Sequence, residues 1–300
     1  MNFLKYKWFY FLISALFLVP GFYSLVRWGL EPAIDFAGGT ILEYEQKTDQ
    51  GIEIEKIKKV LDEKEFSFDS VQISGEKKFV IKGEPAQREK VAEIKTSLEE
   101  VLATELVEIR FEAVGPSLGK ELLWKTIAGI ILASIGILIY VAWRFKDRRF
   151  GVGAVLAMFH DSLILLGSFS LLGHFYQVEV DTLFVTAVLT TLSFSVHDTV
   201  VVFDSIRENR NLYPQANFDD LANQAIAKTI VRSFNNSLTI IFMLIALLLM
   251  GGATIRWFVA ALLIGTIAGT FSSTFTAVPL LSVWENFKQK RTVKNKARLR

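Results

Sequence analysis

The sequence contains no cysteine. This absence excludes disulfide bonds, thiolate catalysis and cysteine-based metal sites, and it leaves the redox compartment undetermined. The region 33–114 also lacks histidine and any nucleotide-binding loop, so we expect no catalysis there. We therefore expect a protein that is not an enzyme and that binds no cofactor or metal.

Apolar residues are abundant and come in long blocks. They make up 51% of the 300 residues, and the mean hydropathy is +0.37, which is too apolar for an ordinary soluble domain. Six segments are each long enough to cross the ~30 Å hydrocarbon core of a bilayer as a helix. They are Trp8–Val26, Leu122–Trp143, Val152–Gly173, Thr182–Phe203, Ile230–Gly252 and Trp257–Trp284.

Lysine and arginine are unevenly distributed over the short connections between these segments. They are concentrated in 144–149, in 207–210 and after the last segment, whereas the connection His174–Asp181 has none. Because basic connections stay on the cytoplasmic side of a membrane, we expect both termini in the cytoplasm. The predicted parts are a first transmembrane helix (1–29), an extracytoplasmic domain (30–120), a five-helix transmembrane bundle (121–287) and a basic cytoplasmic tail (288–300).

The predicted extracytoplasmic domain alternates between strand and helix patterns. The order of strand, helix, two strands in a hairpin, helix and strand is typical of an α+β ferredoxin-like (βαββαβ) sandwich. The expected elements are Thr40–Gln46, Ile52–Glu65, Phe68–Ser74, Lys77–Lys82, Glu84–Ala103 and Leu106–Val114. The expected fold class is thus an α-helical integral membrane protein with six transmembrane helices and this domain between the first two. The domain is expected to be a docking surface or a moving part.

Glycine and proline mark both joints between this domain and the membrane helices. The first joint reads IDFAGGT (34–40) and the second reads FEAVGPSLG (111–119). Such residues either permit tight turns or act as hinges on which the domain swings. The candidate hinge residues are Gly38, Gly39, Gly115 and Pro116.

One acid, Asp198, lies within the apolar segment Thr182–Phe203, which has no other acid and no lysine or arginine. A charge at the centre of a membrane helix costs ~2.5–3.5 kcal/mol on insertion scales, so a function must compensate for it. Arg232 follows near the start of the next apolar segment. An acid and a base on neighbouring membrane helices predict a paired Asp198 and Arg232 that handle a proton or ion, unless the arginine extends outward to the membrane surface.

The third and fourth segments each contain a His–Asp pair, which is consistent with a weak internal repeat. The pairs are His160-Asp161 and His197-Asp198. Adjacent residues on a helix are about 100° apart, so we expect the two members of a pair to point to different places. Asp161 is either a second ion-carrying acid or a hydrogen-bond acceptor in helix packing. The histidines are either hydrogen-bonded residues of the interior or, in the case of His197, part of an ion relay.

Hydroxyl side chains also recur at i, i+4 spacing near Asp198 and predict one polar stripe on that helix. They are Thr191, Ser195 and Thr199. Together with the charged groups, the stripe completes the expected ion relay. The relay residues are Asp198, Arg232, Asp161, His197 and Thr199.

Four motifs, taken in order along the chain, resemble those of the SecF family. They are IDFAGGT, FEAVGPSLGKEL, HD in the third apolar segment and FSVHDTVVVFDSIRENR in the fourth. SecF is the smaller half of the SecD–SecF accessory of the bacterial protein-export channel, within the resistance–nodulation–division type of proton-driven membrane proteins. The resemblance covers essentially the full length, and it implies that the family's functional carboxylate is Asp198 and its functional arginine Arg232. The asparagine that usually precedes this carboxylate is replaced by His197.

The resemblance implies a multi-pass protein of the bacterial cytoplasmic membrane that uses the proton gradient to drive late steps of preprotein translocation. Its expected partners are a SecD-like subunit, the Sec translocation channel, translocating preproteins and membrane lipids, with no nucleic acid. The sequence leaves two other functions open: proton-driven export of a small molecule or lipid, and a structural subunit that does not titrate. It also leaves the coupling ion open between H⁺ and Na⁺.

Overall fold

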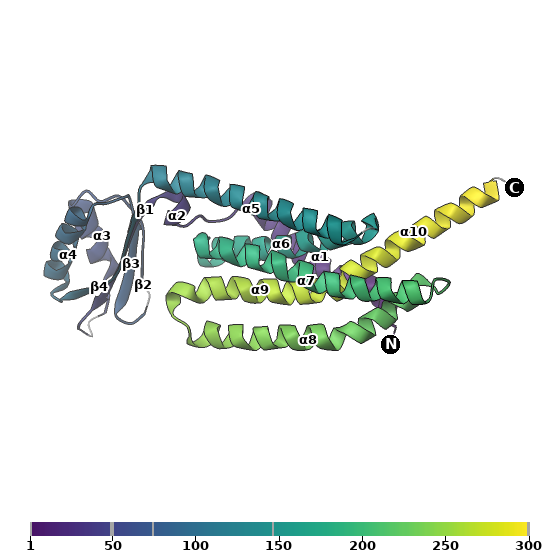
Figure 1. The fold of residues 1–300 in the computed structure, drawn as a ribbon. Helices are drawn as coiled ribbons and strands as arrows, with labels where there is room; N and C mark the ends of the chain where they lie inside the picture. Colours follow the sequence, from purple (N-terminus) through teal and green to yellow (C-terminus); the bar gives the residue numbers. More distant parts are fainter. Residues whose placement is uncertain (1, 49–50, 74, 146, 299–300) are drawn as a thin grey trace. The chain divides into compact units, whose positions relative to one another are not determined.

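A computed structural model describes residues 2–48, 51–73, 75–145 and 147–298 (Figure 1). The chain divides into two compact units. We call Met1–Glu31 together with Gly129–Arg300 the membrane unit, and Pro32–Ala128 the sheet unit. Ser74, which was expected to end a strand, and the last two residues of the basic tail lie outside the described residues.

Within the described residues, six helical segments are long and apolar enough to cross a membrane, as the sequence predicts. The first is the short η1 (Phe3–Tyr6) continued by α1 (Lys7–Arg27). The next four are α5 (Pro116–Arg144), α6 (Arg148–Tyr176), α7 (Thr182–Leu212) and α8 (Phe218–Met250). The sixth comprises α9 (Ala253–Phe275) and α10 (Ala277–Arg298).

The last apolar segment was expected to be one helix, and the structure divides it into α9 and α10. α9 ends at Phe275, and Thr276 leaves the helical conformation with φ −120° and ψ −52°. Pro279 lies four residues after Phe275. Proline has no N–H to bond the carbonyl four residues earlier, and its ring clashes with that carbonyl. The break therefore falls where this proline removes helical support.

α7 is the central helix of the membrane unit and packs against α6, α8 and α9. In its most apolar stretch 50% of the residues are buried, against 6% for α5 and 11% for α8. α7 therefore lies in the interior of the bundle together with the α9–α10 segment, also 50% buried, while α5 and α8 expose most of their apolar side chains.

Small residues allow several of these helices to approach closely. A Cβ atom added to Gly167 of α6 would lie 2.6 Å from the Cα atom of Gly21 on α1. Beside this crossing, the hydroxyl oxygens of Ser24 and Ser170 are 2.7 Å apart. Between α7 and α9, Gly265 lies directly against the side chain of Thr191. Close backbone contact of this kind is how membrane helices gain packing energy.

The sheet unit contains a four-stranded antiparallel sheet with the strand order β2-β3-β1-β4. Its strands are β1 (Gly39–Gln46), β2 (Phe68–Ile73), β3 (Lys78–Gly83) and β4 (Leu106–Val114). Helices α3 (Ile54–Glu63) and α4 (Arg88–Leu102) lie together on one face of the sheet (Figure 1). The order of strands and helices along the chain is the one expected from the sequence. The buried cluster between these layers includes Leu42, Tyr44, Ile57, Leu61, Phe79 and Ile94.

The two glycine-rich joints lie side by side in the sheet unit because β1 and β4 pair at this end. Gly39 pairs with Val114, and the short helix α2 (Ile34–Ala37) precedes them. Gly38 has φ +78° and lies so close to Pro116 that an added Cβ atom would be 3.0 Å from the proline Cα. The positive φ angle explains the need for glycine at this turn. A hinge function of Gly38, Gly39, Gly115 and Pro116 stays a prediction.

Candidate functional site

Asp198 lies near the middle of α7 and is partly buried. Its carboxylate accepts a hydrogen bond of 3.1 Å from the hydroxyl of Ser233 on α8. Ser233 and Ser237 are both buried and lie one turn apart on the face of α8. Residues four apart share a face of a helix, so this serine face meets α7 at the level of Asp198.

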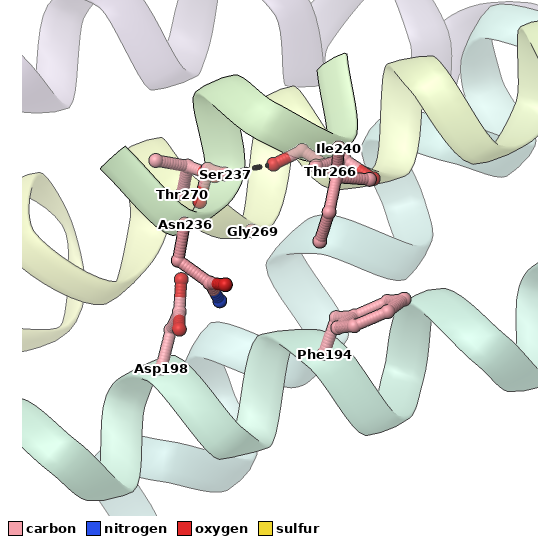
Figure 2. A pocket seen from close by; sticks show the side chains of 8 residues that line it. All are labelled: Phe194, Asp198, Asn236, Ser237, Ile240, Thr266, Gly269 and Thr270. Carbon is pink, nitrogen blue, oxygen red and sulfur yellow. Dashed lines mark hydrogen bonds between the residues drawn. The ribbon is translucent and has the colours of Figure 1, made fainter. Parts of the chain in front are cut away.

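A small cavity opens next to the Asp198 carboxylate, between α7, α8 and α9. It is lined by Phe194, Asp198, Asn236, Ser237, Ile240, Thr266, Gly269 and Thr270. The centre of a water molecule has about 10 Å³ in which to move there, which is about the room that one water needs. Figure 2 shows Asp198 and Asn236 extending from opposite helices toward the same space. The site therefore combines a carboxyl group, an amide and hydroxyl groups around a water-sized space.

The expected contact between Asp198 and Arg232 is absent from this structure. Arg232 is exposed, and in the part of the chain that the structure describes it forms no hydrogen bond or ion pair. Arg232 immediately precedes Ser233, so its side chain leaves α8 about 100° away from the serine that bonds Asp198. The rotation of α8 about its axis therefore decides which of the two side chains meets the acid. A relay function of Arg232 stays a prediction.

The polar stripe expected on α7 faces the interior of the bundle. Thr191, Ser195 and Thr199 are all buried. The Thr191 hydroxyl donates to the carbonyl oxygen of Val188. The hydroxyl oxygens of Ser195 and Thr199 have no hydrogen-bond partner among the described residues. Two buried hydroxyl groups are thus available to bind water.

His197, the neighbour of Asp198, is exposed on α7, so this pair diverges as expected. The other His–Asp pair does not, and the expectation for it was wrong. His160 and Asp161 are both buried, and His160 Nδ1 lies 2.9 Å from Asp161 Oδ1. The angle of about 100° holds at the helix axis, but both side chains are long enough to turn toward each other.

Asp161 is also held by α9, because the hydroxyl of Ser272 donates to Asp161 Oδ2 over 2.6 Å. The hydrogen-bond acceptor in helix packing that the sequence allowed is therefore present. It does not exclude the other alternative, an ion-carrying acid. Within the described residues, no group of three or more histidine, aspartate or glutamate side chains could hold a metal ion.

A network of ion pairs, which was not predicted from the sequence, joins the ends of α5 and α7. Asp204 of α7 pairs with Arg144 at the end of α5 and with Arg207 over 3.2 Å. The spacing of Asp204 and Arg207, three residues apart on one helix, is the signal that could have indicated part of this network.

A second group of ion pairs connects the start of α6 to α7 and α10. Glu285 of α10 pairs with Arg149 and lies 3.7 Å from Arg210 of α7. Asp147, which caps α6, pairs with Arg149 over 2.5 Å. This hydrogen bond from Arg149 holds the pKa of Asp147 below its ordinary value. Basic residues that indicated membrane orientation in the sequence thus also tie three helices together.

Within the described residues, six helical segments are able to cross a membrane, the fourth carries a partly buried acid, and the sheet unit comes between the first two along the chain. These features define a multi-pass membrane protein. The family described as "Protein export membrane protein SecD/SecF, C-terminal" matches residues 93–287. Protein translocase subunit SecF of Thermobaculum terrenum is 39% identical over 95% of this chain and 94% of its own length. The SecF subunit of Anaerolinea thermophila is 34% identical over the same shares. The chain belongs to the SecF family, as the four motifs indicated.

A solved structure supports the same assignment. The crystal structure of SecDF from Thermus thermophilus, a translocon-associated membrane protein, matches this chain with a TM-score of 0.83 and 31% identity. The match covers 95% of this chain and 39% of the SecDF chain. This chain therefore corresponds to a little over a third of that larger protein.

Proposed function

We propose that this chain is the SecF half of a protein-export accessory that uses a proton gradient, with a SecD-like partner, in late steps of preprotein translocation. The observation that carries the proposal is the environment of Asp198. Its carboxyl group is partly buried in the middle of a membrane-crossing helix, bonded by Ser233 and open to a water-sized space. Acids inside a membrane bundle characteristically mark proton pathways.

We propose H⁺ as the coupling ion. Na⁺ would need several oxygen ligands at once, whereas a carboxyl group and one water suffice for a proton. Each elementary charge that crosses 100 mV supplies ~2.3 kcal/mol, enough to bias a moving element between two positions.

We propose that Arg232 contacts Asp198 after a movement of α8. Rotation of α8 by about 100° about its axis would bring Arg232 to the position that Ser233 now holds beside Asp198. A guanidinium there would favour the carboxylate, and its departure would favour the protonated acid. Alternation between the two positions would let the acid load and release its proton.

The SecD-like partner is supported by the relatives that carry both names. SecDF of Thermus thermophilus and SecDF of Bacillus subtilis match this chain over 35% and 39% of their lengths. The remaining length of those proteins leaves room for a second half. The large exposed apolar surfaces of α5 and α8 are surfaces that such a partner or lipid would cover. The Sec channel and translocating preproteins are further proposed partners, and nucleic acid is not.

We also propose that the protein lies in the bacterial cytoplasmic membrane with both termini in the cytoplasm. The connections rich in lysine and arginine support this orientation. The sheet unit then faces outward as a ferredoxin-like domain that is not an enzyme and that docks or moves with the translocating chain. The glycines and proline of its two joints are its proposed hinges.

Reconstitution with the SecD-like partner and the Sec channel in vesicles tests the proposal. Asp198→Asn preserves the size of the side chain but cannot exchange a proton. We expect proton flux and gradient-driven translocation to fall about 100-fold, the scale of a positioned proton-transfer group. Asp69→Asn, which changes an exposed acid of the sheet unit, is the matched control and should leave both rates unchanged.

Unchanged translocation with Asp198→Asn would support the structural subunit instead. Gradient-driven efflux of a lipid or small molecule, with no effect of the chain on translocation, would support the exporter.

A further inference from the structure

His160 and Asp161 form a hydrogen-bonded pair inside the membrane unit. Their side chains are 6% and 4% exposed. Asp161 has two partners, His160 on its own helix and Ser272 on α9. His160 uses only Nδ1, because its buried Nε2 has no partner among the described residues. Both carboxylate oxygens of Asp161 are therefore hydrogen-bonded, whereas Nε2 of His160 is not.

The elements packed against α6 present apolar and hydroxyl groups to this pair. α9 contributes Ser272, and α7 contributes Ser195 at the far side of Gly269. Next to His160 lie Ser14 of α1 and Thr276 at the junction of α9 and α10. In the described parts of the chain no lysine or arginine pairs with Asp161. Asp198, on the other side of Gly269, is the acid that shares this interior.

A carboxylate buried without a cation is costly, and a proton shared between the two members of the pair removes that charge. With that proton the pair is neutral overall, whether the proton sits on the carboxyl group or on the imidazole. Without it the pair has a charge of −1. His160 and Asp161 together are thus a site for one proton.

Gly269 of α9 separates this pair from the Asp198 site. It lines the Asp198 cavity. A Cβ atom added to Gly269 would lie 3.6 Å from Asp161 Oδ2 and 3.5 Å from the Cα atom of Ser195. No side chain therefore stands at this position between the two acids, and the unpartnered hydroxyl of Ser195 lies beside it.

His160 also lines a different opening. His160 lines a groove of about 280 Å³ between α1, α6 and the junction of α9 and α10. Most of the groove is apolar, but the hydroxyls of Ser14 and Thr276 meet within it at 3.2 Å. Asp161 thus lies against Gly269, which lines the Asp198 cavity, while His160 lines the groove on the other side of the pair.

We propose that His160 and Asp161 form a second proton-binding site, which exchanges its proton with Asp198 across the gap at Gly269. This inference rests on the proposed proton-coupled function. In the exchange, the O–H bond of the Asp198 carboxyl group breaks and the proton passes through water to the His160–Asp161 pair. Asp198 changes from neutral to −1 while the pair changes from −1 to neutral, so no other reactant is needed.

Proton flux in vesicles that contain the full chain and its SecD-like partner tests the exchange. Asp161→Asn retains an acceptor for Ser272 and nearly the same shape, so a purely structural role would tolerate it. A proton-binding role would not tolerate the loss of the carboxyl group, so we expect proton flux to fall about 100-fold. Asp161→Glu, which restores a carboxyl group, should recover part of that loss. Wild-type flux with Asp161→Asn would overturn the proposal.

Gly269→Ala provides a second, steric test. The added methyl group meets its neighbours at ordinary van der Waals distances of 3.5–3.6 Å, so the bundle can accept it while the gap closes. We expect flux to fall about tenfold. Gly136→Ala in α5 is the matched control, because a Cβ atom there meets nothing within 4 Å. If Asp161→Asn fails to fold, unchanged flux with Gly269→Ala is the result that refutes the exchange.

Asp198→Asn in the same assay separates the two proposals. If Asp198→Asn stops flux while Asp161→Asn and Gly269→Ala do not, the second site is refuted and the proposed function stands. If Asp198→Asn itself leaves flux unchanged, the proposed function fails.

Discussion

The sheet unit and the membrane unit distribute their polar side chains in opposite ways. In the sheet unit the buried polar side chains among the described residues are Thr40, Gln46 and Thr104, and ion pairs such as Lys90–Glu84, at 2.8 Å, lie at the surface. In the membrane unit large apolar side chains are exposed, and hydroxyl groups such as Ser195, Thr199 and Ser272 are fully buried. The surroundings explain the difference, because water rewards the burial of apolar groups and hydrocarbon penalises exposed polar groups.

This contrast shows what holds each unit together. The hydrophobic effect stabilises the sheet unit, as in any small domain in water. Lipid chains are as apolar as leucine, so the membrane helices depend on close packing and hydrogen bonds instead. The membrane unit can therefore bury polar groups that form hydrogen bonds without losing stability.

The largest expected effect on stability comes from truncating the sheet-unit core. Phe79 is completely buried, so Phe79→Ala should destabilise the sheet unit by about 3–5 kcal/mol. Leu132→Ala is the control in α5, where Leu132 is 72% exposed, and it should cost less than about 0.5 kcal/mol. Hydrogen exchange of the sheet amides in the full chain measures the first effect, and thermal unfolding measures the second. Comparable losses of stability in both variants would contradict the contrast between the two units.

A glycine contact should matter next, because packing stabilises the membrane unit. In Gly167→Ala the new methyl group would meet the backbone of Gly21 at 2.6 Å. Overpacking of this kind should cost about 2 kcal/mol by forcing α1 and α6 apart. Thermal unfolding in detergent measures the loss, with Gly129→Ala as control because its Cβ atom would meet nothing within 4 Å. Equal melting temperatures for the two variants would contradict the packing argument.

Removal of one buried hydrogen bond should have a smaller effect. Ser272→Ala leaves Asp161 Oδ2 without its 2.6 Å donor, which should cost about 1.5 kcal/mol. Ser168→Ala is the matched control, since that hydroxyl only donates to the Ile164 carbonyl of its own helix. The same unfolding assay compares them, and a loss in Ser168→Ala as large as in Ser272→Ala would show that the bond to Asp161 is not special.

A smaller effect again is expected in the pH dependence of stability at the start of α6. The Arg149 contact lowers the pKa of Asp147 in the folded protein. The resulting stabilisation is fully present above the ordinary aspartate pKa and is lost as the pH falls through the lowered value. Asp147→Asn should therefore flatten the acid side of a plot of melting temperature against pH. An unaltered acid limb in this variant would mean that Asp147 contributes no linkage.

Glu84 in the sheet unit sharpens the same comparison. Contact with Lys90 lowers its pKa as well, but Glu84 lies at the surface. Solvent screens exposed ion pairs strongly. Glu84→Gln should therefore change the acid limb less than Asp147→Asn does.

The sequence by itself determined the six membrane-crossing segments, the strand and helix order of the sheet unit and the position of Asp198 within an apolar helix. These features depend on the length and periodicity of apolar runs, which are local properties of the chain. The motifs in order along the chain also sufficed for the SecF family.

Only the tertiary structure decided which side chains meet. It placed Ser233 rather than Arg232 beside Asp198, and it joined His160 to Asp161 although they are neighbours on one helix. It also placed Gly269 between the two acids. Such pairings depend on how far each helix is rotated about its axis and on how closely backbones approach, and residue spacing along a single helix contains neither quantity.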